Sequence, residues 1–341
     1  MRRSSYLNLL ITIIISLIAG GIIMILLGHN PFKVYAELFK GAFIGKFNIG
    51  NTLGRFVPIL LTAIAFAISF KVSVFNAGVE GELYLGAIAA AWAGFAIQGL
   101  PKVLHILVCM IVATIVGALW AAVPGVLKAY YRVNEICTTL LLNYVAIFFT
   151  SYLVNNQLSS HTGIPQTPKV LPSATLTMIL KPSKANIGIF ITLAVLLFVY
   201  WLIHYTTLGY KIRSVGSNPF FSDYVGIGTK KIIVIGMLIS GGIGGLAGGI
   251  ESLGTYNRFL DGFSQFIAFD GMLASLIARN NIKMIFIIAL FLASLKNGAL
   301  GMERFTSVPK SIVDAIIAIF ILLTSLEGLI NIRRKVKTIE A

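Results

Sequence analysis

Apolar segments long enough to cross a lipid bilayer recur along the whole chain, and they leave few folds open. A membrane-spanning helix needs roughly 20 mostly apolar residues, and segments of that kind are separated here by polar or Gly/Pro-rich breaks. Ten are expected, at approximately 7–27, 56–72, 83–98, 103–127, 136–154, 187–205, 232–250, 266–278, 284–296 and 311–330. Charged residues make up only 11% of the chain, against about a quarter in soluble proteins. The sequence therefore predicts an all-α, polytopic membrane protein built as a single transmembrane domain over 1–341.

The charges at the two ends predict which side of the membrane each lies on. Arg2 and Arg3 precede an apolar run that is too long for a signal peptide and lacks a cleavage pattern, so we expect an uncleaved first helix that starts in the cytoplasm. Ten crossings then return the C-terminus to the cytoplasm, where basic residues are retained. These are Arg333, Arg334, Lys335 and Lys337. The expected location is a plasma membrane, crossed many times by the chain.

The remaining composition narrows the function. The net charge of +15 comes from 27 basic and 12 acidic residues; because the basic ones sit in short connections and at the ends, lipid headgroups explain them better than nucleic acid does. Cys109 and Cys137 lie in apolar segments and the four histidines are scattered, so we expect no catalytic residue, metal or cofactor. Since no Walker A pattern occurs, an ATPase, if there is one, must be a separate chain.

The ten spans divide into two halves of five, and an odd number of crossings gives the halves opposite orientations. In each half the link between the second and third spans is unusual: residues 75–82 in the first, and 254–271, ending Phe269-Asp270-Gly271, in the second. Interrupted segments at corresponding places in inverted halves point to a translocation pathway. Both could instead be plain loops, with Glu80 and Glu82 solvated at the surface.

Two polar or small-residue patterns predict helix contacts. Glu135, Thr139 and Asn143 recur every four residues and so share one helix face; they either bond neighbouring helices or line a cavity, the former being commoner. Gly241, Gly245 and Gly249 share the same spacing, which allows close backbone approach. The dinucleotide-like letters in this stretch lack the strand and βαβ unit that such a site needs.

The connection 206–231 predicts a short cytoplasmic helix. Asn218 suits an N-cap and Pro219 the first helical position, so the helix should run to roughly Val225, with Gly226 closing it. Flanking basic residues make it either a docking element for a cytoplasmic partner or an amphipathic turn lying on headgroups.

Four blocks of this sequence resemble a known family. Residues 75–86 (FNAGVEGELYLG) look like its FNIGxEGQ block, and Asn134-Glu135 with 142–144 is similar to its NE…LNY block. Residues 215–219 (VGSNP) with Gly226-Ile227 resemble its cytoplasmic VGxNP…GI element, and its late block is matched at 258–259, 269–271 and 279–281. Over about 50–330 the chain thus resembles the permease subunits of bacterial nucleoside ABC importers, a group that also includes permeases for ribose and other simple sugars and, more distantly, for branched-chain amino acids.

Two positions depart from the family pattern. Glu82 stands where the family often has Gln, and Phe221-Ser222 replaces a small Ala-Ala pair. The resemblance implies a permease that works with a second homologous permease chain, cytoplasmic ATP-binding subunits and an extracellular solute-binding lipoprotein. It also implies that 206–231 is the cytoplasmic coupling loop and that solute passes near the two interruptions.

The sequence therefore predicts nucleoside uptake by alternating access, driven by a partner ATPase. The residues expected to line or support the pathway are Phe75, Asn76, Glu80, Asn143, Phe269 and Asp270. Those expected to couple it to the ATPase are Gly216, Asn218, Pro219 and Gly226. A sugar permease of the same kind is one alternative. An ion-coupled secondary transporter, with Asp270 or Glu80 as its proton or cation site, is the other.

Overall fold

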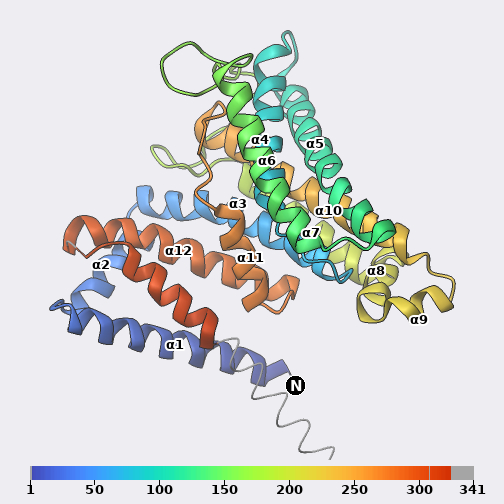
Figure 1. Ribbon diagram of the computed structural model, residues 1–341. Helices are drawn as coiled ribbons and strands as arrows, with labels where there is room; N and C mark the ends of the chain where they lie inside the picture. The colour runs from blue at the N-terminus through green and yellow to red at the C-terminus, as the bar shows by residue number, and fades with distance from the viewer. Residues whose placement is uncertain (1, 307, 324–341) are drawn as a thin grey trace, which may run out of the picture. The chain divides into compact units, whose positions relative to one another are not determined.

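The computed structural model describes residues 2–306 and 308–323 as a set of helices joined by loops (Figure 1). The elements are α1 (Arg2–Leu26), α2 (Pro31–Phe43), α3 (Lys46–Phe70), α4 (Val79–Ala96), α5 (Lys102–Tyr131), α6 (Glu135–Asn155), α7 (Gly188–Tyr205), α8 (Thr207–Ser217), α9 (Pro219–Tyr224), α10 (Thr229–Ile250), a π-helical turn η1 (Glu251–Tyr256), α11 (Ile267–Ile277), α12 (Ile282–Thr306) and a last apolar helix, Ser311–Leu323. The end of the tenth predicted span, 324–330, and the four basic residues from Arg333 to Lys337 lie outside the described residues.

Each predicted span coincides with a helix over the part that the structure describes. Among the described residues, six helices are long and apolar enough to cross a membrane: α3, α5, α6, α7, α12 and α10 continued by η1. The polytopic all-α fold is confirmed. Of the two spans expected to be short, α11 has 11 residues, about 16 Å at 1.5 Å per residue, so it is a half-helix, whereas α12 has 25 and is full length. The sequence did not predict α2 or α8.

The chain forms two compact units, residues 1–52 with 291–341, and residues 53–290. In the first, the helices meet at small residues: a Cβ on Gly41 would lie 2.9 Å from the Cα of Gly301. Asn297 of α12 reinforces this contact, because its Nδ2 lies 3.1 Å from the Gly41 carbonyl and 2.9 Å from Thr52 Oγ1. The second unit contains both of the predicted interruptions.

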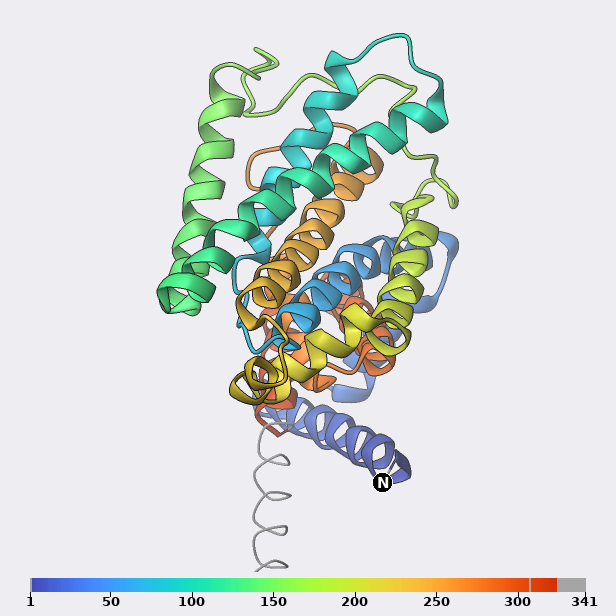
Figure 2. The same cartoon turned by 90° about the vertical axis from the view of Figure 1, so that its right-hand side faces the viewer.

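Helix α10 is the centre of the second unit, and it packs against α4 and α5 (Figure 2). The predicted glycine face makes the contact with α5, and the neighbouring Gly248 makes the contact with α4. A Cβ on Gly245 would lie 2.3 Å from the Ala113 carbonyl oxygen of α5, and one on Gly248 would lie 1.9 Å from the Leu83 carbonyl oxygen of α4. No side chain larger than hydrogen fits at this separation, so the close packing expected from the sequence is confirmed.

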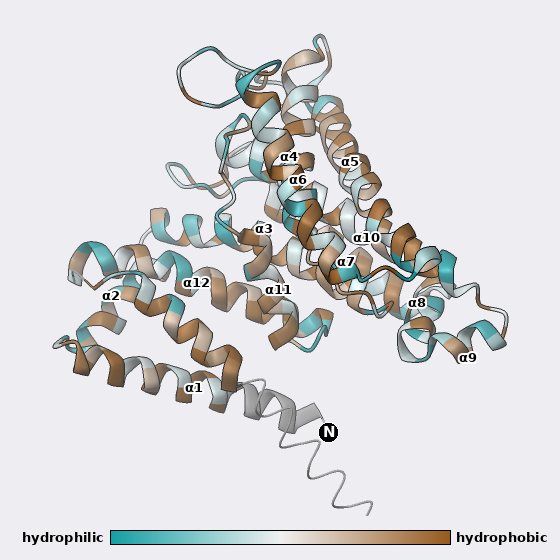
Figure 3. Cartoon of the chain, in the orientation of Figure 1, coloured by the Kyte–Doolittle hydropathy of each residue, from teal (hydrophilic) through white to brown (hydrophobic). Residues whose placement is uncertain are grey.

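The two ends of this unit differ in structure. At one end the short helices α8 and α9 project, and at the other lie the long loop 156–187 and the turn 97–101 (Figure 1). The loop is held in place by backbone bonds, such as Thr167 N to Phe259 O at 3.0 Å and Leu171 N to Gly94 O at 2.9 Å. Hydrophobic residues cover the helices between the ends, and hydrophilic ones concentrate in the loops (Figure 3), as expected for a unit that spans a bilayer.

Candidate functional site

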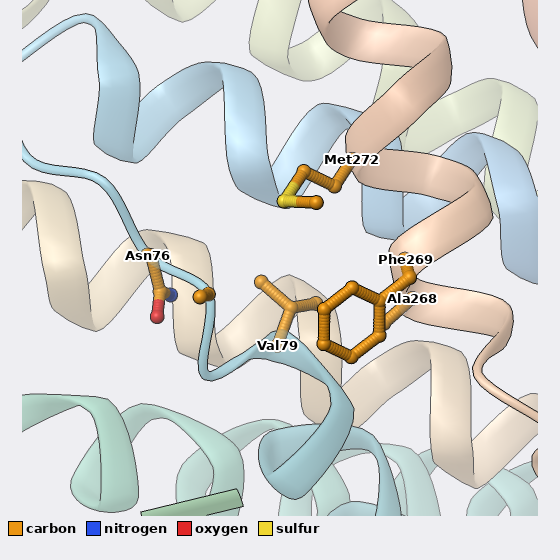
Figure 4. Close-up of a pocket in the computed structure, with 6 residues that line it drawn as sticks. Asn76, Val79, Ala268, Phe269 and Met272 are labelled. Carbon is orange, nitrogen blue, oxygen red and sulfur yellow. The ribbon is translucent and has the colours of Figure 1, made fainter. Parts of the chain in front are cut away.

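The two interruptions predicted from the sequence come together in the second unit. The chain leaves the helix at 71–78, between α3 and α4, and again at 257–266, between η1 and α11. A small pocket lies between the end of the first interruption and the first turns of α11, which follow the second (Figure 4). It is lined by Asn76, Ala77, Val79, Ala268, Phe269 and Met272. Non-helical backbone at membrane depth is tolerated only where protein buries it or where it borders a cavity, and both conditions hold here.

Asn76 holds the first interruption in its bent course. Its Nδ2 donates to Glu82 Oε1 at 2.8 Å and to Ser240 Oγ of α10 at 3.0 Å, while its Oδ1 accepts from the Gly78 amide at 3.0 Å. Ser240 in turn donates to the Ala65 carbonyl of α3 at 2.8 Å. One buried amide therefore ties the start of α4 to both α10 and α3.

Asn143 supports the same segment from α6. Its Nδ2 donates to the Ala77 carbonyl at 2.6 Å and its Oδ1 accepts from the Gly81 amide at 2.7 Å. Gly81 leaves room for this contact, because a Cβ there would lie 3.1 Å from the Asn143 side chain. The polar face predicted on α6 thus bonds one helix to another, the commoner of the two uses considered.

Glu80 joins the two interruptions. Its carboxylate accepts from Ser264 Oγ at 2.6 Å and from the Ala268 amide at 2.9 Å, at the start of α11. A negative charge is favoured there, because the first amides of a helix are unpaired and carry the positive end of its dipole. One turn further along α4, Tyr84 donates to the Ser264 carbonyl at 3.1 Å. The carboxylate therefore lies behind the pocket wall and fastens α11 to α4.

The other predicted pathway residues occupy different positions around the pocket. Phe269 lines it (Figure 4), and its ring packs edge-on against Phe266. Phe75 lies beside the pocket lining and packs edge-on against Phe66 of α3, with ring centroids 4.9 Å apart. Asp270 is half-buried one residue beyond Phe269. Of the six predicted residues, Asn76 and Phe269 are in the lining itself.

The sequence did not single out Val79, Met272 or Ser264 for this site. Val79 and Met272 are ordinary apolar residues on helices, and nothing in their spacing distinguishes them from core positions. Ser264 was detectable in principle, since it lies inside the interrupted stretch 254–271. Its partner, Glu80, is 184 positions away.

The predicted short helix in 206–231 is confirmed as α9. Asn218 is its N-cap, with Oδ1 accepting from the Phe221 amide at 3.0 Å; Pro219 is its first residue; and Gly226 follows its end at φ +84°, a conformation that favours glycine. The whole connection is more structured than expected, because α8 precedes α9. Gly216 lies in α8, where a Cβ would come 2.0 Å from the Lys71 carbonyl oxygen.

Helix α9 presents aromatic side chains outward. Phe220 is 89% exposed and Tyr224 91% exposed, and Phe221 is also exposed. Ser222 is buried instead, with its Oγ 2.9 Å from Ser214 Oγ of α8. Exposed aromatic groups on a rigid helix outside the apolar zone are typical of a protein interaction site.

Comparison with known proteins identifies the family. Residues 48–325 match the family described as the permease component of the branched-chain amino acid transport system. The chain belongs to this family. It is 37% identical to the guanosine ABC transporter permease protein NupP of Bacillus subtilis, over 94% of this chain and 93% of the relative.

Two other relatives match over nearly the same extent. The nucleoside ABC transporter permease protein NupB of Lactococcus lactis is 31% identical over 97% of this chain and 94% of its own length. The glucose ABC transporter permease protein TsgB13 of Haloferax volcanii is 30% identical over 92% and 85%. No solved structure matches the chain. The resemblance inferred from the four sequence blocks is confirmed at the level of the family.

Proposed function

We propose that this chain is the transmembrane permease subunit of an ABC importer for nucleosides. The observation that carries the proposal is the meeting of two broken helices at one apolar pocket inside a chain whose relatives include guanosine and nucleoside permeases. Discontinuous helices that meet within the membrane are the usual place of a transport site.

The chemistry of the pocket suits a flat base better than a sugar. Its lining is apolar apart from Asn76, whose two amide hydrogens are already used by Glu82 and Ser240. A base has a flat face that can stack against Phe269 and contact the Met272 sulfur, whereas a sugar has none. The polar groups of either solute must stay outside the apolar lining, because each one buried there without a partner costs about 1–3 kcal/mol. The pocket is far too small to hold a nucleoside as it stands, so its walls must separate when solute passes, as alternating access requires.

The proposed partners follow from the two ends of the second unit. Cytoplasmic ATP-binding subunits would dock on the exposed aromatic face of α9, which makes 206–231 the coupling loop. Both termini would lie in the cytoplasm, as the terminal charges and the even number of spans predict. The solute-binding lipoprotein would then meet the opposite end, at 97–101 and 156–187, on the outer side of the plasma membrane. A second homologous permease chain would complete the pathway, as the family resemblance implies.

The direct test is uptake of labelled guanosine by proteoliposomes that contain this chain with its partner permease, ATPase and solute-binding protein. We expect uptake to require ATP inside the vesicle and to stop when the ATPase carries an inactive catalytic site. Uptake that continues without ATP while an ion gradient is held would replace this proposal with the ion-coupled transporter, in which Asp270 or Glu80 would bind the ion.

A sugar permease is the second candidate, because TsgB13 is named for glucose. The same vesicles separate the two possibilities: unlabelled adenosine should compete with labelled guanosine, and unlabelled ribose or glucose should not. The reverse order of competition would favour the sugar.

A further inference from the structure

The chain that leads into the pocket wall rests directly on α8. Ser73 Oγ donates to the Gly216 carbonyl at 2.8 Å, across 143 positions of sequence. Two residues earlier, the Lys71 carbonyl lies so close to Gly216 that a Cβ there would be 2.0 Å from its oxygen. Residues 71–73 are therefore held against the end of α8.

The segment 71–73 is close in sequence to the residues that line the pocket. Asn76 follows Ser73 by three positions, a length of chain that spans at most about 11 Å when fully extended. Val72 is held from the other side, since its side chain fills the space beside Gly236 of α10. Asn76 then begins the pocket lining and is bonded to α4 and α10. Only three positions separate Ser73 from Asn76, so a displacement of the end of α8 has a short path to the pocket wall.

Helices α8 and α9 form a single rigid piece. The Asn218 amide donates to the Ser214 carbonyl at 3.0 Å, the Asn218 side chain caps α9, and Ser214 and Ser222 are joined by their hydroxyls at 2.9 Å. A force on the exposed face of α9 is therefore transmitted to the C-terminal end of α8, where Gly216 contacts 71–73.

We propose that the contact of Gly216 with Lys71 and Ser73 transmits the movement of α9 to the pocket wall formed by Asn76, Ala77 and Val79. This inference rests on the proposed function, in which α9 docks the ATPase. Ser73 and Gly216 are positioning residues, because they act through the wall and do not line the pocket. The wall of α11 is fastened to α4 by Glu80, so the same movement pulls on the Glu80 bonds that hold the pocket closed.

The proposal is tested by the number of solute molecules transported per ATP hydrolysed, in the complete reconstituted importer. Ser73→Ala and Ser73→Gly both remove the hydroxyl, and the glycine also suits the φ of +57° at this position. Gly216→Ala forces the Lys71 carbonyl away. Ser217→Ala is the matched control, since Ser217 is an exposed neighbour of Gly216.

We expect both Ser73 variants to retain the ATPase during purification and to hydrolyse ATP within about twofold of the parent rate. Transport per ATP should fall about fivefold or more, because a hydrogen bond of typical strength has been lost from the contact, and Ser217→Ala should match the parent. An unchanged ratio in both Ser73 variants, or an equal fall of transport and hydrolysis, would overturn the proposal even if Gly216→Ala fails to fold. Loss of ATP-dependent uptake in the parent complex would instead refute the proposed function itself.

Discussion

At the scale of single residues, Glu82 acts as an acceptor for Asn76 more than as a charge. Its Oε1 takes the Asn76 amide hydrogen, while Oε2 is buried without a partner beside Gly244. Glutamine keeps the accepting oxygen, so Glu82→Gln should leave the thermal stability of the detergent-solubilised chain unchanged or raise it. Glu82→Leu leaves one Asn76 amide hydrogen without an acceptor and should lower the free energy of unfolding by about 1–3 kcal/mol. Greater stability of the leucine than of the glutamine variant would contradict this assignment.

Asp223 holds the junction between α9 and α10. Its Oδ1 accepts from the Thr229 amide at 3.0 Å, and bonds from Thr229 hold the pKa of the Asp223 carboxyl below its usual value. The folded state therefore favours the ionised form. Its stabilising contribution is present above the ordinary pKa of about 3.9 and is lost as the pH falls through the lower folded value.

Removal of this carboxylate should loosen the junction at neutral pH. We expect Asp223→Ala to speed hydrogen exchange in the peptide 225–232, and Asp223→Asn, which retains an accepting oxygen, to lie between it and the parent. Equal protection in all three proteins would show that the Thr229 bonds contribute nothing.

At the scale of elements, the packing of α10 depends on the absence of side chains at particular glycines. Gly248→Ala would place a Cβ 1.9 Å from the Leu83 carbonyl oxygen, so the backbones of α10 and α4 must move apart. We expect the free energy of unfolding to fall by about 1–3 kcal/mol and the yield of monodisperse protein to be lower. Gly228→Ala is the control, because nothing lies within 4 Å of a Cβ there. Equal melting temperatures would show that the two helices separate without cost.

Helix α9 should be the ATPase contact because its rings are exposed while its other face is fixed to α8. Truncation of Phe220 and Tyr224 together to alanine should reduce co-purification of the ATPase about tenfold or more, as expected when aromatic anchors are removed from an interface. The control is Tyr152→Ala, which removes an exposed ring near the end of α6 that leads into the loop 156–187. ATPase retained by the double variant would move the docking site away from α9.

Elements shaped by interactions within a few residues could be predicted from the sequence, and elements held by distant residues were harder to predict. The cap at Asn218, the proline at 219 and the glycine at 226 act within a few residues, so α9 was predictable almost to its bounds. The spans could be predicted for the same reason, because the length of each apolar run is itself a local feature of the sequence. By contrast, α8 has little apolar character and is held by Lys71 and Ser73, which are distant in sequence. Its local signals, the cap at Thr206 and the buried face of Ile212 and Val215, are weak beside the long apolar spans, and the sequence prediction missed them.

At the scale of the whole molecule, the sequence located the two interruptions, and the structure determined which of their residues line the space between them. Asn76 and Phe269 could be predicted because they stand out as polar and aromatic residues within the breaks. Glu80 and Asn143 stood out equally, yet both are used to bond one segment to another. A buried polar residue in a membrane protein must be satisfied by some partner, and whether that partner is protein or solute depends on contacts more than sixty positions apart.

The proposal that the pocket contacts the base and not the sugar leads to a prediction about which solutes are transported. If the apolar walls contact the base, the sugar hydroxyls stay outside the narrowest point and contribute little to passage. Guanosine and 2′-deoxyguanosine should then be transported at rates within about threefold, because the missing hydroxyl made no buried bond whose loss would cost more. Phe269→Ala should lower the transport of both alike, with the same solute-binding protein present, since it removes the ring against which the base stacks. A variant that impaired guanosine transport while sparing the deoxynucleoside would show that Phe269 responds to the sugar, and the assignment of the pocket to the base would have to be abandoned.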